Sequence, residues 1–287
     1  MITRFAPSPT GPLHLGHAYS AFLAHDMARA AGGQFLLRIE DIDHTRCRTA
    51  WEEQIYDDLT WLGITWDGPV MRQSERTEAY QTALTTLWEQ GLLFECTCNR
   101  RDILHAASAP QEGAPPTYGP DGILYPGTCR EKGANPGGAP LPSGVLRLNM
   151  AAATRVVGVD ALTFTEMAYA PTGTVTFNDQ VETVGDIVLS RRDYLGSYHL
   201  SVVLDDAAQG VTQVIRGEDL FEATKIHVIL QRLLSLPTPT YHHHHLIRDD
   251  MGKRLAKRDD ARAIAKYRAE GALPEDVRAI VGISSSY

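Results

Sequence analysis

The chain has 287 residues, enough for one large domain or two modest ones, and its composition is that of a soluble globular protein. No apolar run reaches the roughly 18 residues that a membrane span needs and no export signal begins the chain, so we expect a cytoplasmic protein without membrane contact. The net charge of −8 argues against nucleic-acid binding through overall charge, so any RNA contact would use a local basic patch.

The beginning of the chain predicts a strand, a turn and a helix. Ile2–Phe5 suits a short buried strand, and the prolines and Gly11 that follow predict a turn. From Leu15 onward the apolar residues have helical spacing. A helix entered in this way points its unpaired N–H groups and the positive end of its dipole towards the turn, where His14 and His17 stand. These histidines are either phosphate-binding residues or ordinary polar residues at a helix start.

The same segment resembles a known family. His14-Leu15-Gly16-His17 resembles the HIGH motif of class I aminoacyl-tRNA synthetases, and the run from Arg4 to His17 is similar to their glutamyl branch. The resemblance implies an enzyme that activates an amino acid with ATP, with His14 and His17 as catalytic residues. It further implies ATP-binding roles for His14, Gly16 and His17 and glutamate-binding roles for Arg4, Ala6 and Ser8.

Gln34–Glu40 predicts a strand that ends in a carboxylate. Side chains at the carboxyl ends of strands line the ligand crevice of a doubly wound sheet, so Glu40 is either a ligand-binding residue or a solvated acid. The resemblance favours the first interpretation, because the matching glutamate of the family holds the amino group of the substrate. Helical patterns follow over Trp51–Leu62 and Tyr80–Trp88, and we assign both to the core.

Cys96, Cys98 and Cys129 are candidates for a metal site. Cysteines one residue apart form poor disulfides, whereas three thiolates brought together supply most of a tetrahedral zinc site. From the spacing alone, free thiols are an equal alternative. In the short paralogues of glutamyl synthetases that this chain resembles, a CxC pair, a tyrosine and a cysteine four residues later bind zinc, which implies Cys96, Cys98, Tyr125 and Cys129 as Zn²⁺ ligands. His105 is the alternative to Tyr125 as the fourth ligand.

Short β-prone runs replace the helical pattern from Val145 to Val188, and they predict an inserted β-rich module. Class I synthetases split their nucleotide-binding sheet with such an insertion, which would touch the acceptor end of tRNA. Arg191-Arg192 would be its basic spot, or simply a solvated charge pair.

The sheet is then expected to resume. Ser201–Asp206 and Val211–Asp219 each predict a buried strand that ends in charge, and the apolar residues from Ile226 to Leu233 predict a helix.

A second match to the glutamyl family covers these strands. It implies that Tyr198 contacts the glutamate substrate and that Arg216 clasps its side-chain carboxylate. The chemistry agrees, because a planar guanidinium can bond a carboxylate at two points. The alternative for Arg216 is a structural ion pair with Glu218 or Asp219.

His242–His245 is a run of adjacent histidines inside the chain. Consecutive residues on a strand alternate between faces, so at most two of these rings could share one ion. We expect adventitious nickel binding and no physiological metal at this run.

Lys253-Arg254-Leu255-Ala256-Lys257-Arg258 resembles the KMSKS loop of the family. Arg254 replaces the first lysine and Ala256 the serine, while Lys257 keeps the position that meets the triphosphate. The resemblance therefore implies that Arg254 and Lys257 bind ATP together with Mg²⁺, and that Lys257 is catalytic. The lost hydroxyl removes one hydrogen bond worth about 1.5–3 kcal/mol. The alternative is a solvated basic face.

The resemblance as a whole implies an α/β fold in which a class I synthetase Rossmann-type parallel sheet is split by an inserted zinc-containing, acceptor-binding-like module and followed by a short C-terminal helical segment. The expected boundaries are 1–92 for the first half of the nucleotide-binding domain, 93–188 for the inserted module, 189–240 for the second half, and 241–287 for the KMSKS-like loop and the helical segment. The large anticodon-binding part of full-length glutamyl synthetases is expected to be missing.

The length and the zinc pattern resemble the short paralogues, which implies a definite reaction. L-glutamate would be activated with ATP without tRNA and transferred to queuosine at the wobble position of tRNA(Asp). The alternatives are a truncated glutamyl-tRNA synthetase that charges tRNA(Glu) and a tRNA-binding paralogue without catalysis. The expected partners are therefore L-glutamate, ATP and tRNA(Asp) bearing queuosine, and by analogy the chain is expected to be a monomer.

Overall fold

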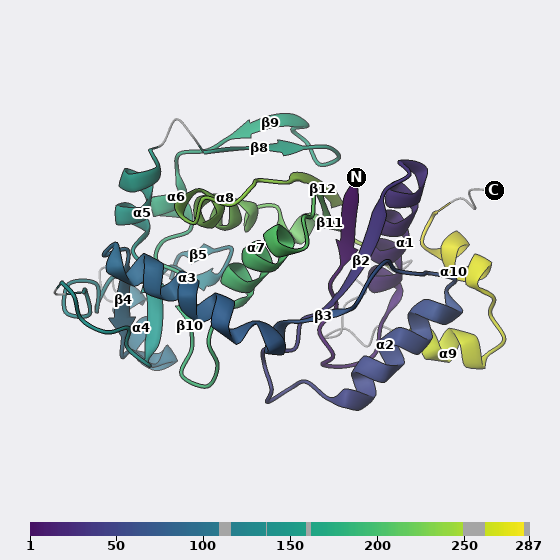
Figure 1. Cartoon of the computed structure of the whole chain (residues 1–287), viewed down its shortest axis with the longest axis horizontal. Coiled ribbons are helices and arrows are strands. Elements are labelled where there is room, and N and C mark those ends of the chain that lie inside the picture. Colours follow the sequence, from purple (N-terminus) through teal and green to yellow (C-terminus); the bar gives the residue numbers. More distant parts are fainter. Residues whose placement is uncertain (109–115, 136, 159–161, 249–261, 284–287) are drawn as a thin grey trace.

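Three parallel strands and two helices form the N-terminal part of the protein, shown by a computed structural model that describes residues 1–108, 116–135, 137–158, 162–248 and 262–283 (Figure 1). Their bounds are Ile2–Phe5 for β1, Leu15–Ala30 for α1, Gln34–Ile39 for β2, Thr49–Trp61 for α2 and Met71–Arg72 for β3. The strands lie in the order β1-β2-β3. The strand-turn-helix start and the strand before Glu40 are thus confirmed.

A second sheet continues this arrangement later in the chain. Its order is β11-β12-β8-β9, with β11 at Gln213–Gly217, β12 at Thr240–His244, β8 at Thr163–Glu166 and β9 at Gly173–Thr176. β11 and β12 are parallel, and β12 pairs with β8 in parallel at a single position. The backbone N–H of Thr212 donates to the carbonyl of Ile2 at 3.0 Å, which places β11 beside β1. The carboxyl ends of these parallel strands therefore share one edge.

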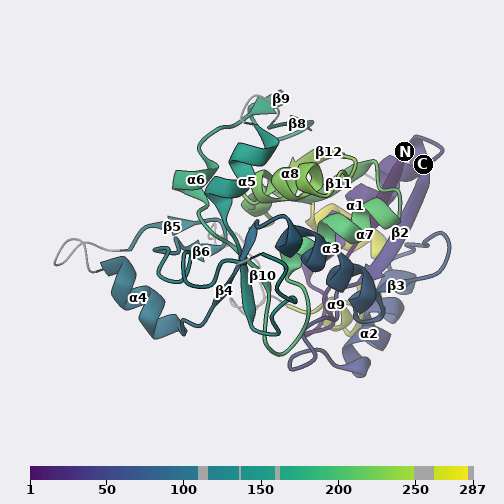
Figure 2. The same cartoon turned by 60° about the vertical axis from the view of Figure 1, so that its left-hand side comes forward.

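An antiparallel sheet occupies the other end of the molecule. β4 (Leu93–Cys96), β7 (Val145–Leu148) and β10 (Val188–Ser190) lie in the order β10-β7-β4. The short hairpin of β5 (Tyr118–Gly119) and β6 (Gly122–Ile123) and the helix α4 (Arg100–Ser108) lie at this end, far from β1 and β2 in both views (Figure 2). Part of the region predicted as an inserted β-rich module thus forms this sheet, whereas β8 and β9 join the sheet of β11 and β12.

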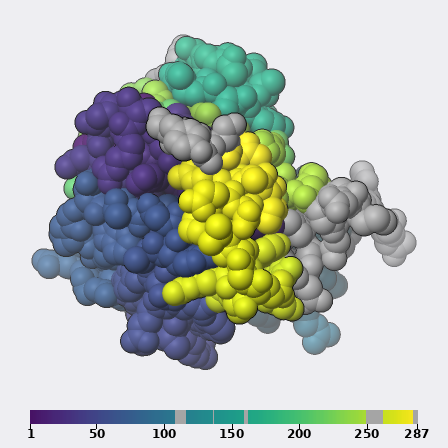
Figure 3. All heavy atoms as spheres, turned by 90° about the vertical axis from the view of Figure 1, so that its right-hand side faces the viewer, coloured from purple at the N-terminus to yellow at the C-terminus, as the bar shows by residue number. Residues whose placement is uncertain are grey.

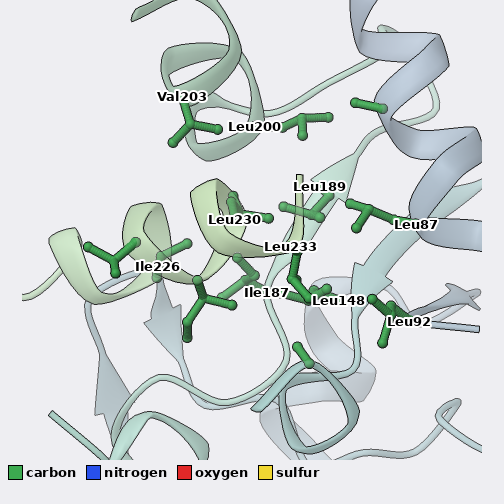
Figure 4. Packing of buried hydrophobic residues seen from close by; sticks show 14 of the residues in the cluster. Leu87, Leu92, Leu148, Ile187, Leu189, Leu200, Val203, Ile226, Leu230 and Leu233 are labelled. Atoms are coloured by element: carbon green, nitrogen blue, oxygen red, sulfur yellow. The ribbon is translucent and has the colours of Figure 1, made fainter. Parts of the chain in front are cut away.

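Helices join the antiparallel sheet to the sheet of β11, β12, β8 and β9, in which β8 and β9 are antiparallel, through a common core. The helices are α3 (Thr77–Glu89), α5 (Met150–Val157), α6 (Gln180–Thr183), α7 (Tyr198–Ala208) and α8 (Thr224–Leu233), with short 3-10 turns at Gln73–Arg76 and Glu218–Leu220. Leu87 of α3, Leu148 of β7 and Leu230 of α8 are buried in one cluster (Figure 4). A separate cluster lies between α1, α2 and the first sheet.

Two predicted strands are helices in the structure. Ser201–Asp206 lies in α7, and Arg155–Val157 of the predicted β-prone run lies in α5. The side chain of Ser197 accepts the backbone N–H of Leu200 and caps α7 at its beginning. Because α7 buries Leu200, Val202, Val203 and both aspartates, its apolar residues show no helical period, and an unbroken apolar run fits a buried helix or a strand equally well.

The C-terminal part consists of two short helices that pack against the N-terminal half (Figure 3). α9 spans Ile264–Ala269 and α10 spans Pro274–Ile280. Arg278 pairs with Asp26 of α1 at 2.6 Å, and Arg268 pairs with Asp57 of α2 at 2.6 Å. Among the residues described, none of the helices combines the length and the apolar character needed to cross a bilayer.

Candidate active site

One cavity collects most of the predicted site residues. It has a volume of about 410 Å³ and lies where β1, β2, β11 and β12 end and α1 and α7 begin. Of the residues predicted to bind glutamate or ATP, its walls contain Arg4, Ala6, Ser8, His14, Gly16, His17, Glu40, Tyr198 and Arg216. Arg254 and Lys257 lie outside the described residues, so their place in the site stays a prediction.

Several wall residues were not assigned to the site from the sequence. They are Ser20, Gly217, Asp219, Leu220, His244, Leu246 and Ile247. Leu246 and Ile247 come two and three residues after the end of β12, and residues at the carboxyl end of a parallel strand are the usual lining of such a crevice. Their position just after a predicted strand is the feature of the sequence from which Leu246 and Ile247 could have been assigned to the site.

The two motif histidines stand at the start of α1. His14 is the N-cap residue, and its backbone N–H donates to Nδ1 of His17 at 3.2 Å. The two rings are stacked, with centroids 3.7 Å apart. Because Nδ1 of His17 accepts a hydrogen bond, the proton of the neutral ring is on Nε2, which can donate to an anion. Together with the positive end of the dipole of α1, the arrangement suits a phosphate.

A buried cluster of charges holds Arg4 and Glu40 of the cavity wall, through Asp206 and Arg38, which do not themselves line the cavity. Nε of Arg4 donates to Oδ1 of Asp206 at 2.9 Å, and Nη1 of Arg38 donates to the same oxygen at 2.6 Å. Nη2 of Arg38 also donates to Oε1 of Glu40 at 3.3 Å. Two cations therefore face two anions. The sequence did not point to Asp206 or Arg38 as parts of the site, since their partners are distant in the chain.

Burial and the charges of these arginines shift the pKa values of Asp206 and Glu40 in opposite directions. Burial raises the pKa of Asp206, but the charges of Arg4 and Arg38 outweigh it, so the pKa is lowered overall. Burial also raises the pKa of Glu40, and there the arginines compensate only in part, so the pKa is raised overall. Asp206 therefore stays deprotonated at lower pH than an ordinary aspartate. Glu40 takes up a proton at higher pH than an exposed glutamate.

Arg216 has a different environment, because its hydrogen-bond partners are uncharged. Its guanidinium donates to His243, His227, Thr224 and the carbonyl of Leu220 at 2.6 to 3.3 Å. Among the residues described, it has no carboxylate partner, so the alternative of an ion pair with Glu218 or Asp219 is wrong. Tyr198 lines the same cavity.

The predicted zinc ligands come together away from this cavity. The Sγ atoms of Cys96, Cys98 and Cys129 all lie within 4.8 Å of one another. The hydroxyl oxygen of Tyr125 is 3.4 Å from Sγ of Cys96 and 3.6 Å from Sγ of Cys98. Zinc bonds of about 2.3 Å in a tetrahedron separate two sulfur ligands by about 3.8 Å, so the spacing fits the ion. His105 is exposed on α4 and lies outside this cluster, which corrects the alternative assignment.

The chemistry of Cys129 agrees with a metal site. Burial raises the pKa of its thiol, but hydrogen bonds from Tyr125, Thr97 and Cys98 outweigh burial and lower the pKa to about 6. Zinc binds the thiolate form of cysteine, which this environment favours at neutral pH.

The histidine run contributes to the cavity and to its support. His244 lines the cavity, and its Nε2 lies 2.7 Å from Oγ of Ser20. His243 is buried and faces Arg216, while His245 is exposed and 3.4 Å from the hydroxyl of Tyr19. The rings thus point to several places, as expected for consecutive strand residues. Nickel binding by this run stays a prediction.

The fold and the cavity define a class I aminoacyl-tRNA synthetase catalytic domain. Residues 1–284 match the family described as tRNA synthetases class I (E and Q), catalytic domain, and the chain belongs to this family. It is 64% identical over 283 residues to the glutamyl-Q tRNA(Asp) synthetase of Rhodobacter capsulatus, a match that covers 99% of this chain and 100% of that protein. The protein of the same name from Geobacter sulfurreducens is 41% identical over 269 residues, which cover 93% of this chain and 79% of that protein.

Solved structures share the architecture. A glutamate tRNA ligase from Elizabethkingia meningosepticum, in complex with its amino acid, superposes with a TM-score of 0.77 at 28% identity. The match covers 98% of this chain but only 60% of that ligase. A methionyl-tRNA synthetase from Mycobacterium tuberculosis has a TM-score of 0.61 at 11% identity, covering 98% of this chain and 63% of that one, and so shares the fold.

We expect Asp206→Asn to destabilise the protein by about 3–5 kcal/mol, because it leaves Arg4 and Arg38 buried without a counter-charge. The matched control is Asp57→Asn, which removes the exposed partner of Arg268 and should cost less than about 1 kcal/mol. Urea unfolding of both variants gives the two values. Equal losses would contradict the role assigned to Asp206.

Proposed function

We propose that this chain activates L-glutamate with ATP and transfers it to queuosine at the wobble position of tRNA(Asp). The observation that carries the choice of amino acid is the presence of two opposite charges, those of Glu40 and Arg216, in the wall of one cavity. An amino acid with a second carboxylate presents an ammonium group and an anion that match them. The choice of RNA is supported by the 64% identity, over its whole length, to a protein named for tRNA(Asp).

The proposed roles follow from chemistry. Arg216 and Tyr198 would bind the side-chain carboxylate of glutamate, Glu40 its ammonium group, and Arg4, Ala6 and Ser8 would complete the pocket. A carboxylate is acceptor-only and therefore needs donors, which a guanidinium and a phenol supply. Since Arg4 is paired with Asp206, Arg216 is the better candidate for the charge on the substrate.

ATP would lie over the start of α1. His14, His17 and the helix N-terminus would hold the α-phosphate, and Gly16 would let it approach the backbone. Arg254 and Lys257 would bind the β- and γ-phosphates. Ile247, before that loop, lines the cavity, and Ala263, after it, pairs with His14 in an isolated β-bridge, which supports this assignment.

The reaction needs positioning and charge stabilisation and no covalent enzyme intermediate. The α-carboxylate of glutamate would attack the α-phosphorus of ATP, and pyrophosphate would leave. Mg²⁺ would come as the counter-ion of ATP, because this ion is usually held by substrate phosphates and few protein ligands. Donors at His14 and His17 would stabilise the growing charge on the phosphate oxygens.

Zn²⁺ would be held by Cys96, Cys98, Tyr125 and Cys129, where it would cross-link β4 to the loop after β6. The proposed boundaries 1–92, 93–188, 189–240 and 241–287 would then separate two halves of the nucleotide-binding domain, a zinc-bearing module and a C-terminal segment. We further propose that the chain is a cytoplasmic monomer.

The proposed function predicts transfer of labelled glutamate to tRNA(Asp) that contains queuosine, in the presence of ATP and Mg²⁺, and none to tRNA(Asp) without it. Glutamate-dependent exchange of pyrophosphate into ATP should proceed without tRNA, and Arg216→Ala should abolish both signals. Label on tRNA(Glu) would instead identify a truncated glutamyl-tRNA synthetase, and absence of both transfer and exchange would identify a non-catalytic paralogue.

Acidification should weaken glutamate use through Glu40. Protonation removes the charge that binds the ammonium group, and because the pKa of Glu40 is raised, kcat/KM for glutamate should fall at a higher pH than the usual glutamate pKa of about 4.3. This fall in kcat/KM at low pH, the acid limb of the profile, should disappear in Glu40→Gln. The control Glu53→Gln, on the exposed face of α2, should keep it. Exchange rates between about pH 5 and pH 8 measure the limb. A Glu40→Gln profile that keeps it would exclude the assignment.

The zinc assignment predicts about one Zn²⁺ per purified chain. Cys98→Ser should lower the zinc content and the unfolding temperature, because a ligand is lost from the tetrahedron. Cys47→Ser is the matched control, since Cys47 lies outside the cluster and should leave both unchanged. Metal analysis and thermal unfolding provide the readouts, and equal zinc contents in the two variants would refute the site.

A further inference from the structure

The hydrogen bonds of Arg216 account for four of the five N–H groups that a guanidinium carries. Nε donates to Nε2 of His243 at 3.0 Å, and Nη1 donates to Nδ1 of His227 at 2.9 Å. Nη2 donates to Oγ1 of Thr224 at 2.6 Å and to the carbonyl of Leu220 at 3.3 Å. Within the described ranges, the second N–H of Nη1 has no hydrogen-bond acceptor. Arginine only donates, so each of these partners must accept.

This requirement fixes the histidine tautomers along a first chain of hydrogen bonds, which runs from Arg216 through His227 and His199 to Asp121 and is called the first arm. Because Nδ1 of His227 accepts from Arg216, the ring proton of His227 is on Nε2, which lies 3.1 Å from Nδ1 of His199. Nδ1 of His199 must then accept, so its proton is on Nε2, which lies 3.2 Å from Oδ1 of Asp121. All protons point away from Arg216 and towards Asp121, in the turn between β5 and β6.

A second arm runs from Arg216 through His243 to Glu166, and its histidine tautomer is fixed in the same way. Nε2 of His243 accepts from Arg216, so its proton is on Nδ1, which lies 2.5 Å from Oε2 of Glu166. The other carboxylate oxygen of Glu166 accepts the backbone N–H groups of Ala168, Tyr169 and His243 at 2.9 to 3.0 Å. Glu166 is buried and fully bonded, which fixes the ring of His243.

Both histidines that touch Arg216 are therefore neutral. A second proton on either ring would sit on the nitrogen that accepts from the guanidinium. Burial and the charge of Arg216 lower the pKa of His227, and the same causes lower the pKa of His243 to about 4. The carboxylates of the two arms lie one imidazole away, at Glu166, and two imidazoles away, at Asp121. Among the residues that the structure describes, no carboxylate therefore neutralises the charge of Arg216 at hydrogen-bond distance.

We propose that His227 and His243 are positioning residues that set side-chain specificity, because they fix the Arg216 guanidinium with neutral acceptors and leave its charge for an anionic ligand side chain. This inference rests on the proposed function, in which Arg216 meets the side-chain carboxylate of glutamate. A carboxylate ligand supplies the missing negative charge. A carboxamide, as in glutamine, does not, and it leaves the buried cation unpaired.

The hydrogen-bond partners of Arg216 differ in charge from those of Arg4 in the same cavity. Arg4 is held by the carboxylate of Asp206, so its charge is already compensated. A negatively charged acceptor in place of His227 would turn Arg216 into a second such pair. The geometry of the guanidinium would be similar, but its attraction for an anionic ligand would be weakened.

The test compares His227→Gln with His227→Glu, which differ in charge and little in shape. In glutamate-dependent pyrophosphate exchange with the full chain, His227→Glu should raise the KM for glutamate about tenfold or more and reduce the preference for glutamate over glutamine by a similar factor, with the KM for ATP within about twofold of wild type. His227→Gln keeps a neutral carbonyl acceptor and should raise the KM for glutamate less than about fivefold.

The matched control is Gln180→Met, which removes a buried side-chain hydrogen bond to Thr154 outside the cavity wall. It should leave the KM for glutamate, the KM for ATP and the preference for glutamate over glutamine unchanged. If His227→Glu lacks a cooperative thermal transition, Thr224→Asn and Thr224→Asp make the same comparison at the hydroxyl that accepts from Nη2 of Arg216. The acidic member should again raise the KM for glutamate about tenfold above the neutral one.

The outcomes separate this inference from the proposed function. Equal KM values for glutamate in the neutral and the acidic variant at the same position would overturn the inference that Arg216 needs uncharged partners. A parallel rise in the KM for ATP would also overturn it, because a loss of general structure affects both substrates. Absence of glutamate-dependent exchange in the wild type would remove the proposed function and this inference together.

Discussion

The shared carboxylate of Asp206 is the interaction on which the cavity depends. It reaches from α7 to Arg4 of β1 and Arg38 of β2, across 202 and 168 residues of sequence. Breaking one partner from such a buried set leaves an uncompensated charge, so the three residues hold the ends of β1 and β2 against the later half of the chain. The cavity is formed at that junction, between parts of the chain that lie far apart in sequence.

Two arginines in this cavity are held in opposite ways, and the difference gives the site its chemical character. Arg4 is compensated by Asp206, whereas Arg216 is held by imidazoles, a hydroxyl and a carbonyl. Glu40 adds a carboxyl group, and the start of α1 adds the groups that we propose bind phosphate. A dicarboxylic amino acid beside the α-phosphate of ATP satisfies all of them. The fold alone would leave the amino acid open, because the same architecture is shared with a methionyl-tRNA synthetase.

Local signals in the sequence were enough for much of this arrangement. The strand, turn and helix up to Ala30 and the helix α8 follow from apolar spacing and helix-stopping residues. The motif residues led to half of the residues in the cavity wall. The helix α7 was missed because a segment buried on every side has no period to read. The roles of Asp206 and His227 were missed for another reason, since they depend on partners that only the folded chain brings near.

In the proposed site, the positive charge of Arg216 selects the side chain of the amino acid. A crystal structure of the full chain with a non-hydrolysable glutamyl-adenylate analogue tests it most directly. We expect the side-chain carboxylate to accept hydrogen bonds from the remaining N–H of Arg216 Nη1 and from the hydroxyl of Tyr198, with the bonds from Arg216 to His227 and His243 intact. A side-chain carboxylate bound to Arg4, with Arg216 turned away from it, would contradict the account.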